Sequence, residues 1–299
     1  MITGLTHPGI SVSNLENWLA FIRNNLNANQ ISSQVSDQDY LAKVTGFPGA
    51  KLKIGFIKFS EHSFPLEVIE YLHPKGKMQT IPYGVVGYAH LAFLVKNIDA
   101  LHALNKENGL STSEIINLDH PYWGKYRSYR LLAPDNIPIK ILSTQNSSKT
   151  FKEDIQIHHS GLTVSDLKEA EKLLSKVLDL EVVYRGQQTQ DCLAPDLNTD
   201  YQYVILKIPT HDFWIELRLF NNKTQKSEID MGHNHFGSVH HCFQVDDIFN
   251  DYAILKDAGV NFFGLPAQVT AGINQGAFAI YFCGFDGYRF EIFQKPHKI

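Results

Sequence analysis

Residues 240–248 read His-His-Cys-Phe-Gln-Val-Asp-Asp-Ile, and the pattern in this stretch occurs four times in the chain. In each copy a histidine is followed three residues later by a large apolar residue, five residues later by valine, and seven residues later by Asn or Asp. The four histidines are His7, His90, His159 and His240. His7 and His159 are 152 residues apart and His90 and His240 are 150 apart, so the chain resembles a duplicated pair of modules.

Each module is predicted to have the order βαβββ. In module 1 a strand over Gly4–Val12 precedes a helix that begins after Asn14, a typical N-cap residue. Apolar runs at Tyr40–Val44, Lys51–Phe59 and Phe64–Leu72 then predict three strands. The other modules repeat this order with caps at Asn97 and Asp166, and the helix predicted over Leu167–Leu178 has the clearest apolar stripe. The sequence therefore predicts an α+β fold of four βαβββ modules.

A polar connector, Ser143–Lys149, separates the two pairs of modules. We therefore predict an N-terminal domain over residues 1–149, with modules 1 and 2, and a C-terminal domain over residues 150–299, with modules 3 and 4. A chain of this size can bury roughly 75% of its unfolded surface, enough for two cores. The long polar stretch Asn221–Gly237 is predicted to be a loop that folds over a mouth.

The composition limits the partners. There are 27 basic and 31 acidic residues and no basic run that would follow a phosphate backbone, so nucleic acid is not an expected partner. Cys192, Cys242 and Cys283 are far apart and lack metal-type spacing, which predicts small buried residues in a reducing compartment. No stretch reaches about 18 uninterrupted apolar residues, so we expect a cytoplasmic protein without a membrane span.

A second position recurs in the last strand of each module, and it is occupied by Glu67, Lys140, Glu216 and Glu291. A carboxylate flanked by apolar strand residues is costly to bury unless it is paired or bound to a cation. A single strand histidine is usually structural, but four in register with three carboxylates predict a site for one divalent metal. Imidazole and carboxylate ligands suit Zn²⁺, Ni²⁺, Co²⁺, Mn²⁺ or Fe²⁺.

These positions, together with the phrases His90–Val95 (HLAFLV) and Phe285–Ile292 (FDGYRFEI), resemble the vicinal oxygen chelate superfamily. That superfamily includes glyoxalase I, methylmalonyl-CoA epimerase, type I extradiol dioxygenases and bleomycin-resistance proteins. In it each βαβββ unit carries a histidine on its first strand and a carboxylate on its last. Two units curl into a cup that holds one metal. The resemblance covers the whole chain and implies two cup-shaped domains of mixed sheet.

Two pairings of the modules are compatible with this resemblance. If modules 3 and 4 share a site, the implied metal ligands are His159, Glu216, His240 and Glu291. Fused glyoxalases can also pair module 1 with 4 and module 2 with 3, and the implied set is then His7, Glu67, His240 and Glu291. Lys140 leaves the site that contains His90 incomplete under either pairing. A lysine there could hold a substrate anion, replace a cation, or mark a half that has lost its function.

A four-ligand site implies a metal-dependent lyase or isomerase of the glyoxalase type. Such an enzyme acts on a small molecule with vicinal oxygens through an enediolate-like intermediate, with Glu291 or Glu216 moving a proton. The expected partner is that small molecule, and the protein is expected to be a monomer or a homodimer.

Two alternatives to this function remain open. The first is an Fe²⁺ extradiol dioxygenase with iron on His159, His240 and Glu291, in which Tyr281 stands where those enzymes carry a functional tyrosine. The stretch before Tyr281 has no histidine, and Glu216 stands where a catalytic histidine is expected, which disfavours ring cleavage. The second alternative is a protein that sequesters a drug or metabolite.

Other aromatic residues have simpler expected roles. His158 and His241 neighbour proposed ligands in a strand, so their side chains are predicted to point to the opposite face. His233 and His235 are predicted to be solvated in the polar loop. Trp123 is a candidate for the lining of a pocket, and Tyr281 is expected to pack in a strand as well as being a candidate catalytic residue.

Overall fold

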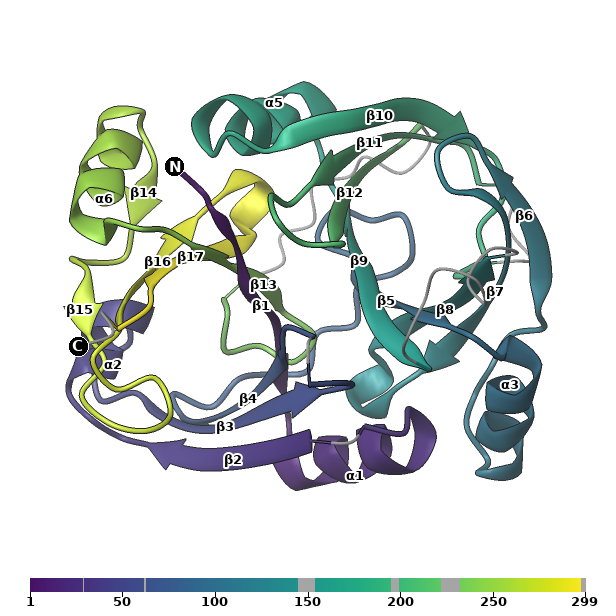
Figure 1. Cartoon of the computed structure of the whole chain (residues 1–299), viewed down its shortest axis with the longest axis horizontal. Coiled ribbons are helices and arrows are strands. Elements are labelled where there is room, and N and C mark those ends of the chain that lie inside the picture. The colour runs from purple at the N-terminus through teal and green to yellow at the C-terminus, as the bar shows by residue number, and fades with distance from the viewer. Residues whose placement is uncertain (29, 62, 145–153, 195–198, 222–231, 297–299) are drawn as a thin grey trace.

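The chain forms two curved β-sheets that lie side by side, with helices on their outer surfaces (Figure 1). This computed structural model describes residues 1–28, 30–61, 63–144, 154–194, 199–221 and 232–296. The α+β class and the cup-like curvature agree with the predicted fold. No helix in these described ranges is long and apolar enough to cross a membrane.

The first sheet is built by the two ends of the chain. Its order is β14-β16-β17-β13-β1-β4-β3-β2, with β15 paired to β16. Module 1 supplies β1 (Gly4–Val12), β2 (Gln30–Ser36), β3 (Lys51–Lys58) and β4 (Leu66–His73), and module 4 supplies β13 (Val239–Gln244), β14 (Asn261–Phe262), β15 (Ala267–Gln268), β16 (Phe278–Cys283) and β17 (Arg289–Gln294). The first strand of each module pairs in parallel with its last, and β1 meets β13 antiparallel.

The second sheet is built by the middle of the chain, in the order β10-β11-β12-β9-β5-β8-β7-β6. Module 2 supplies β5 (Ala89–Val95), β6 (Ile116–His120), β7 (Gly124–Leu132) and β8 (Pro138–Thr144), and module 3 supplies β9 (Ile155–Thr163), β10 (Glu181–Gln188), β11 (Tyr201–Lys207) and β12 (Trp214–Phe220). The parallel pairs β5–β8 and β9–β12 meet at the antiparallel pair β5–β9.

Module 1 therefore pairs with module 4, and module 2 with module 3. The predicted grouping of modules 1 and 2 in residues 1–149 and of modules 3 and 4 in residues 150–299 does not correspond to the two sheets. The four modules share one pattern, so their first strands offer similar edges to one another. Local sequence consequently does not specify which edges meet.

The predicted helix caps are confirmed. The helices α1 (Leu15–Asn25), α3 (Ile98–Glu107), α5 (Leu167–Lys172) and α6 (Ile248–Asp257) each follow an Asn or Asp whose side chain accepts a hydrogen bond from the first turn. The predicted caps are Asn14, Asn97 and Asp166, and the structure adds Asp247 as the cap of α6. The helix predicted over Leu167–Leu178 continues past α5 as a π-helical turn, Leu173–Val177.

One element of module 1 was predicted wrongly. Tyr40–Val44 is not a strand but belongs to the short helix α2 (Tyr40–Thr45), where the Thr45 hydroxyl donates to Leu41 O at 2.7 Å and Gly46 ends the helix in the left-handed region. The missing strand is β2, a largely polar edge strand. Because an edge strand does not need a continuous apolar face, its sequence signal is weak.

The largest hydrophobic core cluster includes residues from both sheets, such as Phe93 on β5 and Phe243 on β13. The sheets are also joined by a hydrogen bond of 2.6 Å between Ser160 Oγ on β9 and His241 Nε2 on β13. The two cups therefore form one packed body, and each brings the ligand-type side chains of two modules together.

Candidate metal site

The first sheet brings together His7 on β1, Glu67 on β4, His240 on β13 and Glu291 on β17. His7 Nε2 lies 3.2 Å from Glu67 Oε2 and 3.7 Å from Glu291 Oε2. His240 Nε2 lies 3.2 Å and 3.9 Å from the same two atoms. All four residues are buried. Two imidazoles and two carboxylates thus converge; we call this group the first site.

The register of the strands explains this convergence. Gly9 on β1 pairs with His240 on one side and with Glu67 on the other, so the three residues form one row across the sheet. A Cβ atom at Gly9 would lie 1.9 Å from His240 Cε1. The absence of a side chain at this position is therefore what lets the imidazole of His240 lie over β1 toward Glu67.

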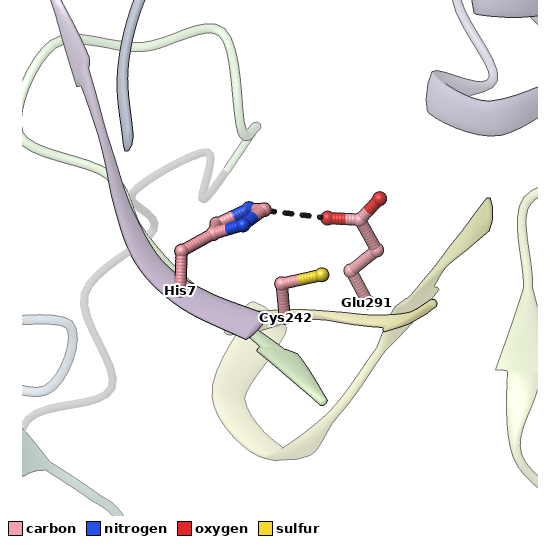
Figure 2. Close-up of side chains that lie close together, drawn as sticks. All are labelled: His7, Cys242 and Glu291. Carbon is pink, nitrogen blue, oxygen red and sulfur yellow. Dashed lines mark ion pairs between the residues drawn. The ribbon is translucent and has the colours of Figure 1, made fainter. Parts of the chain in front are cut away.

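A second row, across β1, β13 and β17, contains a residue that the sequence did not single out as a ligand. Cys242 on β13 pairs with His7 on β1 and with Glu291 on β17. Figure 2 shows the Cys242 thiol between the His7 ring and the Glu291 carboxylate. The ligand atoms of His7, Cys242 and Glu291 lie within 4.8 Å of one another, as do those of His7, Glu67 and His240.

These residues fit a divalent metal. Neither ring nitrogen of His7 has a hydrogen-bond partner of good geometry, although both atoms are buried and Nε2 is close to Glu67. His7 Nε2 and Glu67 Oε2 are therefore close together without the alignment of a hydrogen bond. A buried, unpaired polar atom costs about 1–3 kcal/mol, and coordination of a metal would remove this cost. Imidazole and carboxylate are suitable ligands for it.

Burial and neighbouring charges give the carboxyl groups of Glu67 and Glu291 different pKa values. Burial alone would raise the pKa of Glu67, but His7 and His240 outweigh it and hold the pKa well below its usual range. Burial raises the pKa of Glu291 to about 7, with His7 opposing this shift and the charge of Glu67 adding to it. In the metal-free protein near neutral pH, Glu67 is therefore ionised and Glu291 is partly protonated.

A cavity of about 60 Å³ opens onto the first site. His7, Glu67 and Glu291 line it, and most of the remaining wall is aromatic or aliphatic, with Tyr40, Leu52, Ile54, Phe56, Ile69, Tyr71, Val269, Tyr281 and Phe293. No lysine or arginine among the described residues lines this cavity. Tyr281 places its hydroxyl oxygen 3.1 Å from His240 Nε2, at the edge of the ligand set.

A second cavity of about 220 Å³ lies where the two sheets meet and is lined by residues such as Tyr88, Arg130 and Tyr288. None of the candidate ligands lines this space. Of these two cavities, the smaller one is therefore lined by candidate metal ligands.

The equivalent place in the second sheet holds His90 on β5, Lys140 on β8, His159 on β9 and Glu216 on β12. The same two rows are present, with Gly161 between His90 and Glu216 and with Ala92 between His159 and Lys140. We call this group the second site. It repeats the geometry of the first site, with lysine in place of Glu291 and alanine in place of Cys242.

A buried ion-pair network occupies the second site. Arg218 on β12 donates to Glu216 Oε2 at 2.7 Å through Nη2 and at 2.9 Å through Nε, and to Asp191 Oδ2 at 2.7 Å. Lys140 Nζ lies 3.7 Å from Asp191 Oδ1. All four charged groups are buried. The two cations balance the two carboxylates, so this site is neutral without a metal.

The positive charges also affect the histidines of the second site. Burial, Arg218 and Lys140 together lower the pKa of His90, and burial with His158 and Lys140 among the neighbouring charges lowers that of His159. Both rings are therefore neutral. Trp123 stacks on His159 with ring centroids 4.6 Å apart and also packs beside His120. Trp123 thus covers the second site, and among the cavities described above it lines none.

The predicted ligand set is therefore corrected in its membership. His159, Glu216, His240 and Glu291 do not meet, because the first two lie in the second sheet and the last two in the first. The iron set His159, His240 and Glu291 is divided in the same way. The set His7, Glu67, His240 and Glu291, expected from the alternative pairing, is the one that the fold assembles.

Three predictions about other histidines are also corrected. His158 does not face away from His159, because a β-bulge at this point places the two Nδ1 atoms 2.7 Å apart. His233 and His235 are buried rather than solvated. His233 stacks on Tyr281 with ring centroids 5.1 Å apart, and His235 Nδ1 accepts from the Lys77 backbone at 3.0 Å. His241 lies in the core between the sheets, as expected of the face opposite His240.

The predicted covering loop Asn221–Gly237 is only partly described, since residues 222–231 lie outside the described ranges. Sequence reasoning also missed Arg218, Asp191 and Cys242. Two of these had a usable signal: Arg218 follows Glu216 by two residues and Cys242 follows His240 by two, so each shares the strand face of a candidate ligand.

Comparison with known proteins relates part of this chain to a family. Residues 156–292 match the profile of the Glyoxalase/Bleomycin resistance protein/Dioxygenase superfamily. Among solved structures, glyoxalase I from Zea mays superposes with a TM-score of 0.67 at 16% identity, covering 97% of this chain and 92% of that one. A putative dioxygenase from Bacillus subtilis subsp. subtilis str. 168 superposes with a TM-score of 0.63 at 14% identity, covering 99% of this chain and 86% of that one. No curated protein gave a significant sequence match.

The whole chain therefore has the vicinal oxygen chelate fold. Residues 156–292 belong to the Glyoxalase/Bleomycin resistance protein/Dioxygenase superfamily. At these identities the structural likeness establishes the fold alone.

Proposed function

We propose that this protein is a metal-dependent lyase or isomerase of the glyoxalase type, with its active centre at the first site. The observation that supports this proposal is the convergence of His7, Glu67, His240 and Glu291 at the base of a cavity. Members of the superfamily to which residues 156–292 belong include enzymes named for such chemistry, and the fold is shared with glyoxalase I.

A divalent cation held by these four residues would supply a Lewis acid that polarises two adjacent substrate oxygens. Zn²⁺, Ni²⁺, Co²⁺, Mn²⁺ and Fe²⁺ all accept this ligand set. The protein contributes rigidity, because all four donors come from central strands and have neighbours in the sheet register. It also excludes water, because all four donors are buried.

The two carboxylates are the candidates for moving a proton between adjacent carbons of the substrate. Both line the cavity, and they reach the histidines from strands on opposite sides, Glu67 from β4 and Glu291 from β17. One carboxylate can therefore accept a proton from the substrate while the other keeps its position among the ligands. General acid–base catalysis of this kind contributes typically 10²- to 10⁴-fold to a rate.

The cavity wall suggests the class of substrate. Its lining is mainly aromatic and aliphatic and has no cationic side chain among the described residues, and its volume is only about 60 Å³, so it suits a small uncharged molecule. The amide side chain of Asn274 at the wall offers hydrogen bonds to a second part of the molecule. We therefore propose a neutral substrate with vicinal oxygens rather than a polyanionic conjugate.

Reconstitution with single metals tests the function. Metal-free protein loaded in turn with Zn²⁺, Ni²⁺, Co²⁺, Mn²⁺ and Fe²⁺ is assayed with uncharged 2-oxoaldehydes, their thiol adducts and α-hydroxy ketones. We expect metal-dependent isomerisation that Glu67→Gln and Glu291→Gln each reduce by about 10²-fold or more. Glu70→Gln is the control, because Glu70 lies on the same strand but accepts from the backbone N–H of Leu15 at 3.0 Å.

Extradiol ring cleavage is the rival function, and Tyr281 is the observation in its favour, since its hydroxyl lies beside His240. The first site also contains two histidines and a carboxylate that Fe²⁺ could use. Oxygen uptake with catechols by the Fe²⁺-loaded protein, without isomerisation by any metal form, would replace the glyoxalase proposal. Tight small-molecule binding without turnover would indicate sequestration instead.

A further inference from the structure

Cys242 lies beside two of the ligands of the first site, His7 and Glu291. It lies on the middle strand β13, directly opposite His7 on one neighbouring strand and Glu291 on the other. Its side chain shares the sheet face of His240, two residues earlier, and it is fully buried. Figure 2 shows the sulfur directed into the space between His7 and Glu291.

The surroundings of this thiol combine ligand-type groups with core residues, since Cys242 also belongs to a hydrophobic cluster with Tyr281 and Phe293. Its sulfur belongs to a set with His7 and Glu291 whose ligand atoms lie within 4.8 Å of one another. His7, in the same set, has ring nitrogens that are buried and lack a hydrogen-bond partner of good geometry. Cys242 therefore faces an imidazole and a carboxylate in addition to the apolar groups of its cluster.

We propose that Cys242 is a further ligand of the metal at the first site and that its thiolate makes this site select thiophilic cations. This inference rests on the proposed metal site. It adds to that site a sulfur donor and a preference for thiophilic cations. Soft thiolate favours Zn²⁺, Co²⁺, Ni²⁺ and Cd²⁺ over Mn²⁺ and Mg²⁺, which prefer oxygen ligands. Two imidazoles, a thiolate and carboxylate oxygens form a mixed set of the kind that borderline metals accept.

The binding step is balanced by the loss of one proton. The S–H bond of Cys242 breaks, the sulfur electron pair forms the bond to the cation, and the proton leaves to the solvent. A coordinating cation deprotonates a thiol, and the bond that it forms with sulfur has to outweigh the burial that favours the neutral thiol in the metal-free protein. No oxidant or reductant is needed.

The second site supplies a natural comparison. Ala92 holds the position of Cys242 there, between His159 and Lys140 on the neighbouring strands. Alanine is thus compatible with this place in the sheet, and Cys242→Ala should fold. Thiol-specific effects can then be separated from effects of packing with Cys242→Ser, which keeps nearly the same volume.

Cobalt substitution tests the proposal directly. Metal-free wild-type protein, Cys242→Ala, Cys242→Ser and Cys283→Ser are titrated with Co²⁺ and followed by absorption in the near ultraviolet. Cys283 is the matched control, because it is a half-buried thiol on β16 whose sulfur contacts Arg289 Nη1 at 2.8 Å outside the ligand rows. We expect a sulfur-to-cobalt charge-transfer band in the wild type and in Cys283→Ser, and its loss in both Cys242 variants.

Affinity gives a second, independent result. Cys242→Ala should weaken Cd²⁺ binding by at least the roughly 10- to 100-fold that follows mutation of groups around a metal ligand, and leave Mn²⁺ binding unchanged. Cobalt bound by the wild type without the sulfur band, or equal Cd²⁺ affinity in the wild type and Cys242→Ala, overturns the role of Cys242 while leaving the four-ligand site intact. Absence of any bound metal in the wild type overturns the metal site itself.

Discussion

Ile69 and Arg218 occupy equivalent positions, each two residues beyond the carboxylate on the last strand of its module, Glu67 and Glu216. Ile69 lines the cavity of the first site. Arg218 instead extends its guanidinium between Glu216 and Asp191. The first site consequently lacks an arginine at this position. The second site carries Arg218 and Lys140 beside its buried carboxylates.

This difference predicts one tightly bound metal per chain. A cation at the second site would have to compete with Arg218 and Lys140 for Glu216 and Asp191, so it is electrostatically disfavoured. We expect about one equivalent of metal after dialysis, measured by inductively coupled plasma mass spectrometry. His7→Ala should release it, whereas His90→Ala should retain it, and the reverse pattern would place the metal in the second sheet.

The two strand glycines provide a matched pair of variants. A Cβ atom at Gly9 would lie 1.9 Å from His240 Cε1, and one at Gly161 would lie 1.9 Å from His90 Cε1. Both Gly9→Ala and Gly161→Ala therefore displace a histidine ring. Only Gly9→Ala should weaken metal affinity, by about tenfold or more, as measured by competition with a chromophoric chelator. Equal losses in the two variants would contradict the assignment.

Metal affinity should rise with pH through about 7, because the pKa of Glu291 is raised to about 7, mainly by burial, and a ligand carboxyl must lose its proton. The raised pKa of His7 acts in the same direction. Isothermal titration calorimetry between pH 5.5 and 8.5 would show tighter binding and less proton release as pH rises. Glu291→Gln should make this profile less steep, since His7 and the Cys242 thiol still lose protons on binding. A wild-type affinity independent of pH would refute the prediction.

The stability of the metal-free protein should change with pH in the opposite direction. The pKa of Glu291 is about 7 in the folded protein, above the ordinary glutamate value of 4.5, so the folded state binds more protons between these pH values. Its contribution to stability is fully present below about 4.5 and is lost as pH rises to about 7. Chemical denaturation of the wild type and Glu291→Gln at pH 5 and 8 measures this difference.

Removal of Arg218 should destabilise the protein strongly. Arg218→Met leaves Glu216 and Asp191 buried without their main partner, and breaking a buried ion pair in this way costs about 3–5 kcal/mol. Arg185→Met is the control, because the Arg185–Glu171 pair is largely exposed on the arginine side, and such pairs are worth about 0–1 kcal/mol. Denaturant unfolding compares the two variants, and similar losses would show that the network is not a stabilising element.

The helices and most strands could be predicted from sequence because their signals are local. Asn14, Asn97 and Asp166 cap the first turn beside them, and their spacing from each module's histidine identified the repeat. Two elements, β2 and α2, were not predicted, because an edge strand and a six-residue helix have weak hydrophobic periodicity. His158 was misjudged because a bulge changes the alternation of faces without altering composition.

The sequence by itself determined that four modules carry histidines and, in three cases, carboxylates at matching positions, because these properties repeat along the chain. Only the tertiary structure decided that His7 and Glu67 join His240 and Glu291, and that His159 and Glu216 lie elsewhere. The antiparallel pairs β1–β13 and β5–β9 are contacts between distant segments with similar edges. Arg218, Asp191 and Cys242 became visible as members of the sites only when this pairing placed them beside the repeated residues.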